Sequence, residues 1–310
     1  MRAVGVTAFG GPEVLHIVEL PVPEPGDGEV RIKVAAATVN PTDTGLRAGL
    51  RGGPAGVEPP YVPGMELAGE IDSAGPGASW QPGERVMAIV SPWAAGRGAQ
   101  AEYVVVPSDS VARVPDEVSM ATAATLPMNG LTARIALDLL GLQPGQTIAV
   151  TGAAGAVGGY VMQLAANEGL RVIGDASPAD VELVKSLGAD IVVPRGPDVA
   201  AAIRREAPEG VDAMVDAALI GPPVLAAIRD GGQLVAVRPF PGETERSIKI
   251  SLVLVGSHLH EGDKIAELAG LVSEGKLTLR VARELPAEEA VQAHRQLEAG
   301  GTRGRIVLTF

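Results

Sequence analysis

The sequence has 310 residues, of which 46% are hydrophobic and 20% are charged, and no run approaches the roughly 20 apolar residues that span a membrane. The net charge of −12 argues against a surface for nucleic acid or anionic membrane. The chain has no cysteine, which excludes disulfides, thiolate zinc sites and a cysteine nucleophile. Since the N-terminus lacks a hydrophobic signal segment, we expect a cytoplasmic protein. The length of the chain suggests about two domains.

The first third of the chain alternates short strand-like runs with glycine and proline. This spacing predicts an all-β subdomain, a small and partly open barrel, with strands at 30–34, 69–73, 84–90 and 101–106. From Ser119 onward the composition changes to alanine and leucine. Residues 121–140 therefore predict helices, which we expect to be broken near Pro127 and Gly130.

Three glycines follow the next strand-like run, 147–151, and precede a helical pattern at 160–166. A strand, a glycine turn and a helix together predict a dinucleotide site. Gly152 permits a tight turn, Gly155 lets the backbone approach a pyrophosphate, and Gly158 lets the helix pack on its strand. The pyrophosphate would lie at the helix N-terminus, where free N–H groups favour negative charge. The alternative is a plain strand-to-helix turn.

Strands and helices alternate after this turn. We expect strands at 171–174, 190–193, 212–216 and 232–237, with helices at 179–187, 198–207 and 223–229. Repeated βα units predict a parallel, doubly wound sheet, to which residues 247–255 add a strand. Helices at 262–274 and 287–299 and a strand at 304–310 end the chain. We expect this tail to return to the N-terminal β subdomain.

Several motifs taken together point to one family. They lie at 39–43, 63–69, 83–87, 101–104, 126–133, 152–158, 187–190 and 304–308. With these motifs the chain resembles, over nearly its whole length, the zinc-independent branch of the medium-chain dehydrogenase/reductases, the quinone oxidoreductase (zeta-crystallin-like) group. The resemblance implies an α/β fold: a Rossmann doubly wound parallel sheet at 119–264 and a discontinuous GroES-like β-barrel domain at 1–118 and 265–310. It also implies a homodimer in which residues 248–255 pair across subunits.

The triplet at 64–66 departs from the zinc-dependent relatives. They carry a histidine where this chain has Met65, and a thioether is a poor zinc ligand. The cysteine-rich structural-zinc lobe is also missing, and the four histidines show no metal-ligand spacing. We therefore expect no metal site.

Without a metal Lewis acid, a conjugated C=C is easier to reduce than a carbonyl, because the conjugated carbonyl takes up the hydride's charge as an enolate. The resemblance accordingly implies a zinc-free NADPH-dependent reductase of a small enone, quinone or enoyl substrate. Two alternatives stay open. One is an enoyl-thioester reductase in a biosynthetic pathway, and the other is a non-catalytic NADP-binding regulatory protein.

The choice of nicotinamide cofactor depends on the end of the second strand of the nucleotide domain. Asp175 could hold the ribose 2′-OH and favour NAD(H), but by resemblance the selecting aspartate falls at Ala176. Ser177 fits the pattern of NADP-using relatives, and Arg195 is the cation that could reach a 2′-phosphate. We expect NADP(H) in preference to NAD(H), while an ordinary surface arginine is the alternative for Arg195.

Further candidates follow from position. By resemblance, Thr132 lies near the nicotinamide phosphate and Asn40 beside the nicotinamide. The turn residues Ala154, Ala156 and Val157, together with Ala217, Val237 and Arg238 after later strands, complete the predicted cofactor set. Asp43 is a candidate for orienting substrate or for capping a turn, and Trp93 for lining the substrate pocket or packing its loop. Many relatives have a tyrosine where this chain has Gly45, so no catalytic acid is identified. Asn40 and Asp43 are the candidates for a catalytic role.

Overall fold

A computed structural model describes residues 1–95 and 97–310. It divides the chain into two compact units, Met1–Met128 with Gly256–Phe310, and Asn129–Val255. Among the described residues, no helix is long and apolar enough to cross a membrane. The domain boundaries expected from the sequence, at 118/119 and 264/265, stay predictions.

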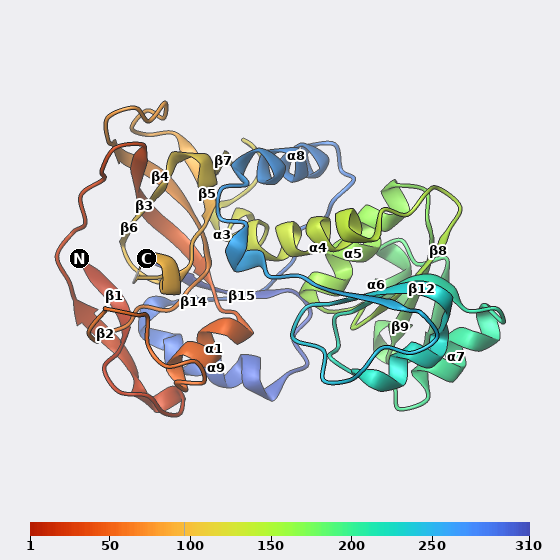
Figure 1. Cartoon of the computed structure of the whole chain (residues 1–310). Helices are drawn as coiled ribbons and strands as arrows, with labels where there is room; N and C mark the ends of the chain where they lie inside the picture. Colours follow the sequence, from red (N-terminus) through yellow and green to blue (C-terminus); the bar gives the residue numbers. More distant parts are fainter. Residues whose placement is uncertain (96) are drawn as a thin grey trace. The chain divides into compact units, whose positions relative to one another are not determined.

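The first unit is built on a seven-stranded sheet. Its strands follow the order β14-β15-β3-β4-β5-β7, and β6 also pairs with β3 (Figure 1). The strands are β3 (Glu29–Thr38), β4 (Glu66–Ala74), β5 (Arg85–Ile89), β6 (Tyr103–Pro107), β7 (Val111–Arg113), β14 (Val281–Pro286) and β15 (Arg305–Thr309). Along β3, Val30, Ile32 and Val34 are buried at alternate positions, as the period of a strand with one face in the core requires.

The C-terminal strand belongs to this same sheet. β15 pairs antiparallel with β3, with Val307 opposite Thr38, so the tail returns to the N-terminal β unit as expected. A separate antiparallel pair is formed by β1 (Arg2–Val6) and β2 (Leu15–Glu19). The helices of the unit are α1 (Pro41–Arg47), α2 (Pro92–Ala95), α3 (Met120–Ala123), α8 (Gly262–Ser273) and α9 (Ala290–Ala299).

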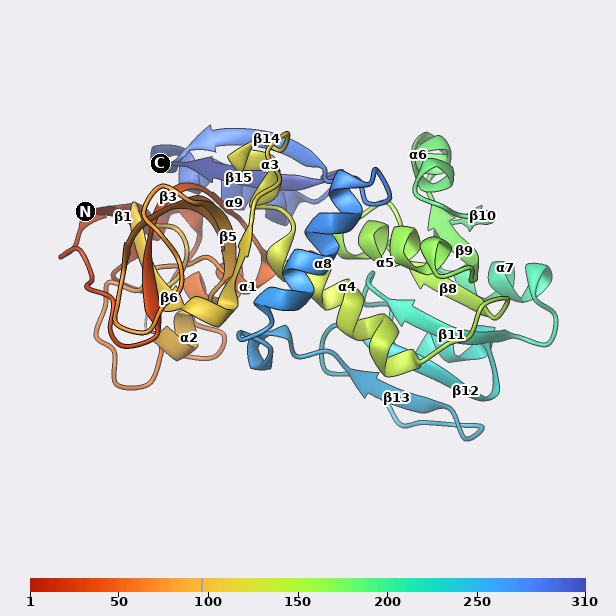
Figure 2. The same ribbon diagram turned by 90° about the horizontal axis from the view of Figure 1, so that it is seen from above.

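The second unit contains a six-stranded parallel sheet in the order β10-β9-β8-β11-β12-β13 (Figure 2). The strands are β8 (Thr147–Thr151), β9 (Arg171–Ala176), β10 (Ile191–Pro194), β11 (Val211–Asp216), β12 (Ile228–Ala236) and β13 (Lys249–Leu252). The helices are α4 (Pro127–Leu140), which begins at the boundary between the units in the sequence, α5 (Ala156–Asn167), α6 (Val181–Ser186) and α7 (Val199–Glu206). β8 and β11 are neighbours although two strands separate them in sequence, so the strand order reverses between them. At such a point the loops beyond the carboxyl ends diverge and leave a crevice for ligands.

Four local expectations were wrong. Gly130 lies inside α4 and does not break it, whereas Pro127 opens this helix, where its missing N–H needs no partner. Residues 223–229 form a short 3₁₀ helix, η4 (Pro222–Ala227), followed at once by β12. The strand expected at 247–255 is reduced to β13. The helix expected from 287 begins as a 3₁₀ turn, η6 (Ala287–Glu289), before α9.

Candidate functional site

The glycine turn joins β8 to α5 at the crevice of the parallel sheet. Gly152 has φ +67°, a conformation that favours glycine, and Gly155 N–H donates to Gly152 O at 2.8 Å to close the turn. A Cβ on Gly158 would lie 2.3 Å from Gly152 O, so only glycine lets the first turn of α5 approach β8 this closely. Gly152 and Gly158 therefore each meet a distinct steric need.

The N-terminus of α5 is accessible to a ligand. Gly155, Ala156 and Val157 are partly exposed, while Ala154 is buried beneath them. The first turn of this 12-residue helix carries no acidic side chain. The dipole of α5 therefore gives positive potential at this helix end, which suits a phosphate group.

Asp175 lies beside this turn, near the end of β9. Its Oδ1 accepts a hydrogen bond from Ala153 N–H at 3.0 Å, and the residue is 3% exposed. Its Oδ2 is buried and has no hydrogen-bond partner among the described residues. Burial raises the pKa of Asp175, against the N–H groups of Ala153 and Gly152 and the positive charge of Arg195.

The residues beyond β9 are placed differently. Ala176, the last residue of β9, is buried, and the Ser177 hydroxyl donates to Asp180 Oδ2 at 2.6 Å. Arg195 follows β10 directly, and its backbone N–H donates to Ala176 O at 2.8 Å. Its side chain is exposed and forms no ion pair within the described ranges. Arg195 is therefore a cation next to the end of β9.

A buried pair that sequence reasoning missed holds the other side of the turn. Thr151 Oγ1 donates to Asp216 Oδ1 at 2.6 Å and accepts from Ala218 N–H at 3.2 Å. Asp216 also accepts the N–H groups of Ile220 and Gly221. These bonds hold the ends of β8 and β11 together. The only sequence feature that could have indicated the pair is the position of both residues at the ends of predicted strands.

The remaining predicted cofactor residues of this unit lie at the carboxyl ends of strands or on α4. Ala217 follows β11 and is partly exposed, and its backbone would contact a Cβ on Gly152 at 3.2 Å. Val237 and Arg238 follow β12, the first partly exposed and the second exposed. Thr132 is buried on α4. Among these residues, Ala217 thus lies next to the glycine turn.

The first unit contains a buried polar cluster around Arg305. Its Nη2 donates to Glu66 Oε1 at 2.7 Å, to Thr38 Oγ1 at 2.8 Å and to Asn40 Oδ1 at 2.5 Å. Glu66 Oε2 accepts Met128 N–H at 2.7 Å, near the start of α4. Arg305 thereby holds the side chain of Asn40, and sequence reasoning missed both Arg305 and Glu66 because each is isolated in the sequence.

Asp43 lies in α1 with no exposed surface. Its carboxylate accepts the N–H groups of Asn40 at 2.7 Å and Gly64 at 3.1 Å, contacts that favour the capping role. Burial raises the pKa of Asp43 to about 7, although these two N–H groups oppose the rise. The carboxyl group thus holds two loops together from inside the unit.

The triplet at 64–66 does not fit a catalytic zinc ion. Met65 is buried, and the carboxylate of Glu66 is engaged by Arg305. Among the described residues, no group of three or more histidine or acidic side chains could hold a metal. Trp93 lies on α2 with the Arg51 guanidinium 5.9 Å from its ring centroid, and its buried Nε1 has no partner in the described ranges.

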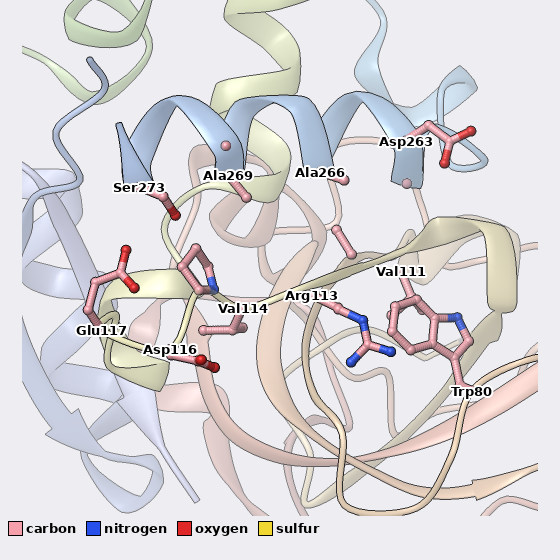
Figure 3. A pocket seen from close by; sticks show the side chains of 14 residues that line it. Trp80, Val111, Arg113, Val114, Asp116, Glu117, Asp263, Ala266, Ala269 and Ser273 are labelled. Atoms are coloured by element: carbon pink, nitrogen blue, oxygen red, sulfur yellow. The ribbon is translucent and has the colours of Figure 1, made fainter. Parts of the chain in front are cut away.

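A groove of about 630 Å³ lies in the first unit between α8 and residues 111–117 (Figure 3). On the α8 side it is lined by small residues, among them Ala266 and Ala269. The guanidinium of Arg113 lies 5.3 Å from the ring centroid of Trp80, also in the lining. None of the predicted site residues lines this groove, so it has no part in the site described above.

Comparison with known proteins assigns the chain to a family. Residues 26–116 match the family model of the alcohol dehydrogenase GroES-like domain, and residues 187–308 match that of zinc-binding dehydrogenases. The chain is 31% identical to a chloroplastic quinone oxidoreductase of Triphysaria versicolor, over 99% of this chain and 98% of that protein. It belongs to the quinone oxidoreductase family of the medium-chain dehydrogenase/reductases.

Solved structures of this fold include users of both nicotinamide cofactors. A mycobacterial protein complexed with NADPH is similar with a TM-score of 0.87 and 31% identity, covering 100% of both chains. An NAD-dependent alcohol dehydrogenase is similar with a TM-score of 0.86 and 33% identity, again over 100% of both chains. The fold is accordingly that of the family, a GroES-like N-terminal domain and a six-stranded parallel Rossmann sheet.

As a quinone oxidoreductase-type enzyme, the protein is an NAD(P)H-dependent oxidoreductase. Its residues fit a dinucleotide. A Cβ on Gly155 would lie 3.0 Å from Gly152 O, so a side chain at this position would crowd the backbone of the turn. The start of α5 is partly exposed, and a helix N-terminus suits a pyrophosphate. The zinc ion of related dehydrogenases, in contrast, lacks its ligands here.

Proposed function

We propose that the enzyme is a zinc-free, NADPH-dependent reductase of quinones or other activated C=C bonds. The observation that carries this proposal is the glycine turn at the partly exposed N-terminus of α5, in a chain whose Gly64–Glu66 triplet offers no zinc ligand set. When bound, NADPH supplies the hydride. The protein supplies binding and orientation, with Gly152, Gly155 and Gly158 shaping the turn for the pyrophosphate.

The preference for NADPH is supported by the residues after β9. Ala176 stands where resemblance places the selecting aspartate of NAD-using relatives, and the exposed Arg195 lies beside it through the bond from its N–H to Ala176 O. A guanidinium group can pair with a 2′-phosphate, and alanine does not repel one. The bond from Ser177 to Asp180 opposes this reading, because it engages the hydroxyl and brings a carboxylate near.

The proposed substrate class is supported by residues of the first unit. Asn40 is a candidate for the nicotinamide side of the site. Arg305 donates to the side-chain oxygen of Asn40 and so fixes the orientation of its amide group. Trp93 and Asp43 are the substrate-side candidates from sequence, with Trp93 the one whose side chain is partly exposed. With Met65 in place of a zinc ligand, a substrate that delocalises its own charge is the best fit.

A substrate panel tests this function. Purified protein is mixed with NADPH or NADH and with quinones, enones or enoyl thioesters, and the near-ultraviolet absorbance of the reduced cofactor is followed. We expect turnover with quinones or enones and a higher kcat/KM with NADPH. A clear NADH preference would overturn the cofactor choice. Turnover of enoyl thioesters alone would instead identify a biosynthetic enoyl reductase.

The alternative from sequence, a non-catalytic nucleotide-binding protein, disagrees with the family assignment. Gly45 favours it, because the hydroxyl that many relatives place there is absent. Cofactor-induced thermal stabilisation without turnover across the whole panel would support that reading. The cytoplasmic location and the homodimer both stay predictions.

A further inference from the structure

Asp175 is the predicted site residue whose contacts differ most from its expected role. A carboxylate that selects the ribose must present its oxygens to the ligand. Here Oδ1 is engaged by Ala153 N–H at 3.0 Å, and Oδ2 is enclosed by protein. With 3% of its surface exposed, the side chain points under the glycine turn and away from solvent.

The sheet register explains this direction. Gly174 is paired with Val150 of β8, and Asp175 is paired with Val193 of β10. Asp175 therefore lies at the level where β8 ends and the turn begins. From this position its carboxylate reaches the N–H of Ala153, the second residue of the turn.

The turn is held from the opposite side as well. Thr151 is bound to Asp216 of β11 and to the N–H of Ala218. A buried carboxylate from each neighbouring strand thus fixes residues 151–153. A turn fixed in this way keeps the N–H groups at the start of α5 directed outward before any ligand arrives, which lowers the cost of ordering them on binding.

We propose that Asp175 is a positioning residue for the pyrophosphate-binding turn and does not select between NADH and NADPH. The inference rests on the proposed function, since it concerns how the same cofactor is held. Selection then falls to groups beyond the strand end, with Arg195 the cation nearest to it.

The test measures dissociation constants of wild-type protein, Asp175→Ala, Asp175→Ser and Asp175→Asn. The probes are NADPH, NADH, adenosine 2′,5′-bisphosphate and 5′-AMP. Within each pair the ligands differ only in the 2′-phosphate, so the ratio of their dissociation constants isolates selection. Truncation to Ala or Ser removes the acceptor for Ala153 N–H, whereas Asn keeps an oxygen in its place.

A matched control comes from the other end of β9. Asp190 Oδ2 accepts Val172 N–H at 2.7 Å, the same kind of contact remote from the glycine turn. Asp190→Ala should lower the melting temperature and leave the dissociation constants of both cofactors within about twofold of wild type. It therefore separates a loss of turn geometry from a general loss of stability.

We expect Asp175→Ala and Asp175→Ser to weaken NADPH and NADH by the same factor, about tenfold, which one lost hydrogen bond of about 1.4 kcal/mol would produce. Asp175→Asn should restore both constants, and the two selection ratios should stay within about twofold in every variant. A shift of either ratio by tenfold towards the 2′-phosphorylated ligand would make Asp175 the selector and overturn the inference. Unchanged binding in the truncations, or an equal loss in Asp190→Ala, would overturn it too. Absence of cofactor binding by wild-type protein would instead refute the proposed function.

Discussion

Two buried ionisable side chains of the first unit respond to pH in opposite directions. Burial raises the pKa of Asp43 to about 7. The folded protein therefore binds the proton of this carboxyl group more tightly than the unfolded chain does. The stability that the protonated Asp43 contributes is lost as pH rises towards 7. Burial, together with the charge of Arg47, lowers the pKa of His294 to about 3. Its neutral form is stabilised, and stability is lost as pH falls below about 6.5.

His294 permits a specific prediction. Its Nδ1 lies 3.4 Å from Arg47 Nη1, while Arg47 Nη2 donates to Glu298 at 2.6 Å. Protonation of His294, which has no exposed surface, would place a second positive charge beside Arg47. We expect wild-type protein to lose about 2 kcal/mol of unfolding free energy from this residue between pH 7 and pH 5. His294→Gln should remove that part of the loss in urea titrations at the two pH values.

The control for this prediction is His16, which is exposed on β2. His16→Gln should keep the pH dependence of the wild type. If His294→Gln showed the same drop between pH 7 and pH 5 as the wild type, the acid sensitivity would have another origin. A drop reduced equally by both substitutions would also contradict the assignment to the buried ring.

At the scale of elements, helical glycines differ in what surrounds them. A Cβ on Gly45 in α1 would meet only Leu50 Cδ1, at 3.7 Å, and one on Gly270 in α8 would meet nothing within 4 Å. A Cβ on Gly158 in α5 would clash with Gly152 O at 2.3 Å. The first two glycines therefore weaken their helices without a steric need, whereas Gly158 permits the close packing of α5 on β8.

Alanine substitutions test this distinction. Gly45→Ala and Gly270→Ala should each add roughly 0.5–1 kcal/mol to the free energy of unfolding, because alanine loses less backbone entropy in a helix. Gly158→Ala should lower the melting temperature and weaken binding of both cofactors, because the turn must shift. Thermal unfolding and cofactor titration measure both effects. Equal behaviour of the three variants would contradict the steric argument.

At the scale of the whole molecule, β13 forms one edge of the parallel sheet, since it pairs only with β12 within the described chain. An edge strand offers unpaired backbone groups to another chain. The edge strand Lys249–Leu252 lies within residues 248–255, the segment that the sequence predicts to pair across the homodimer. Leu254, next to β13, is 54% exposed.

We expect light scattering to give twice the 31.5 kDa mass of one chain. Leu254→Lys should shift the protein towards the monomer, because a charge at the edge opposes strand pairing. Leu139→Lys, at a leucine that is 39% exposed on α4, is the matched control and should leave the mass unchanged. A monomeric mass for wild-type protein would refute the prediction.

Much of the fold and part of the site are local properties of the chain. The β-branched run at 147–151, Gly152, Gly155 and Gly158 specify strand, turn and helix among themselves, and the alternation of later segments predicts the parallel sheet. Met65 and the lack of cysteine already exclude a zinc site of the family type. The inferences of strand, turn, helix and parallel sheet succeed because each depends on neighbours within a few residues.

Only the tertiary structure decides what the buried polar groups do. Arg305 reaches Glu66 across 239 positions, Thr151 reaches Asp216 across 65, and Asp175 turns towards Ala153 across 22. Strand order and register set these partners, and no periodicity in the sequence encodes them. The sequence therefore determined the family and the location of the glycine turn. Whether Asp175 faces a ribose or the turn was decided by packing, because the direction of a side chain at a strand end depends on the strands beside it.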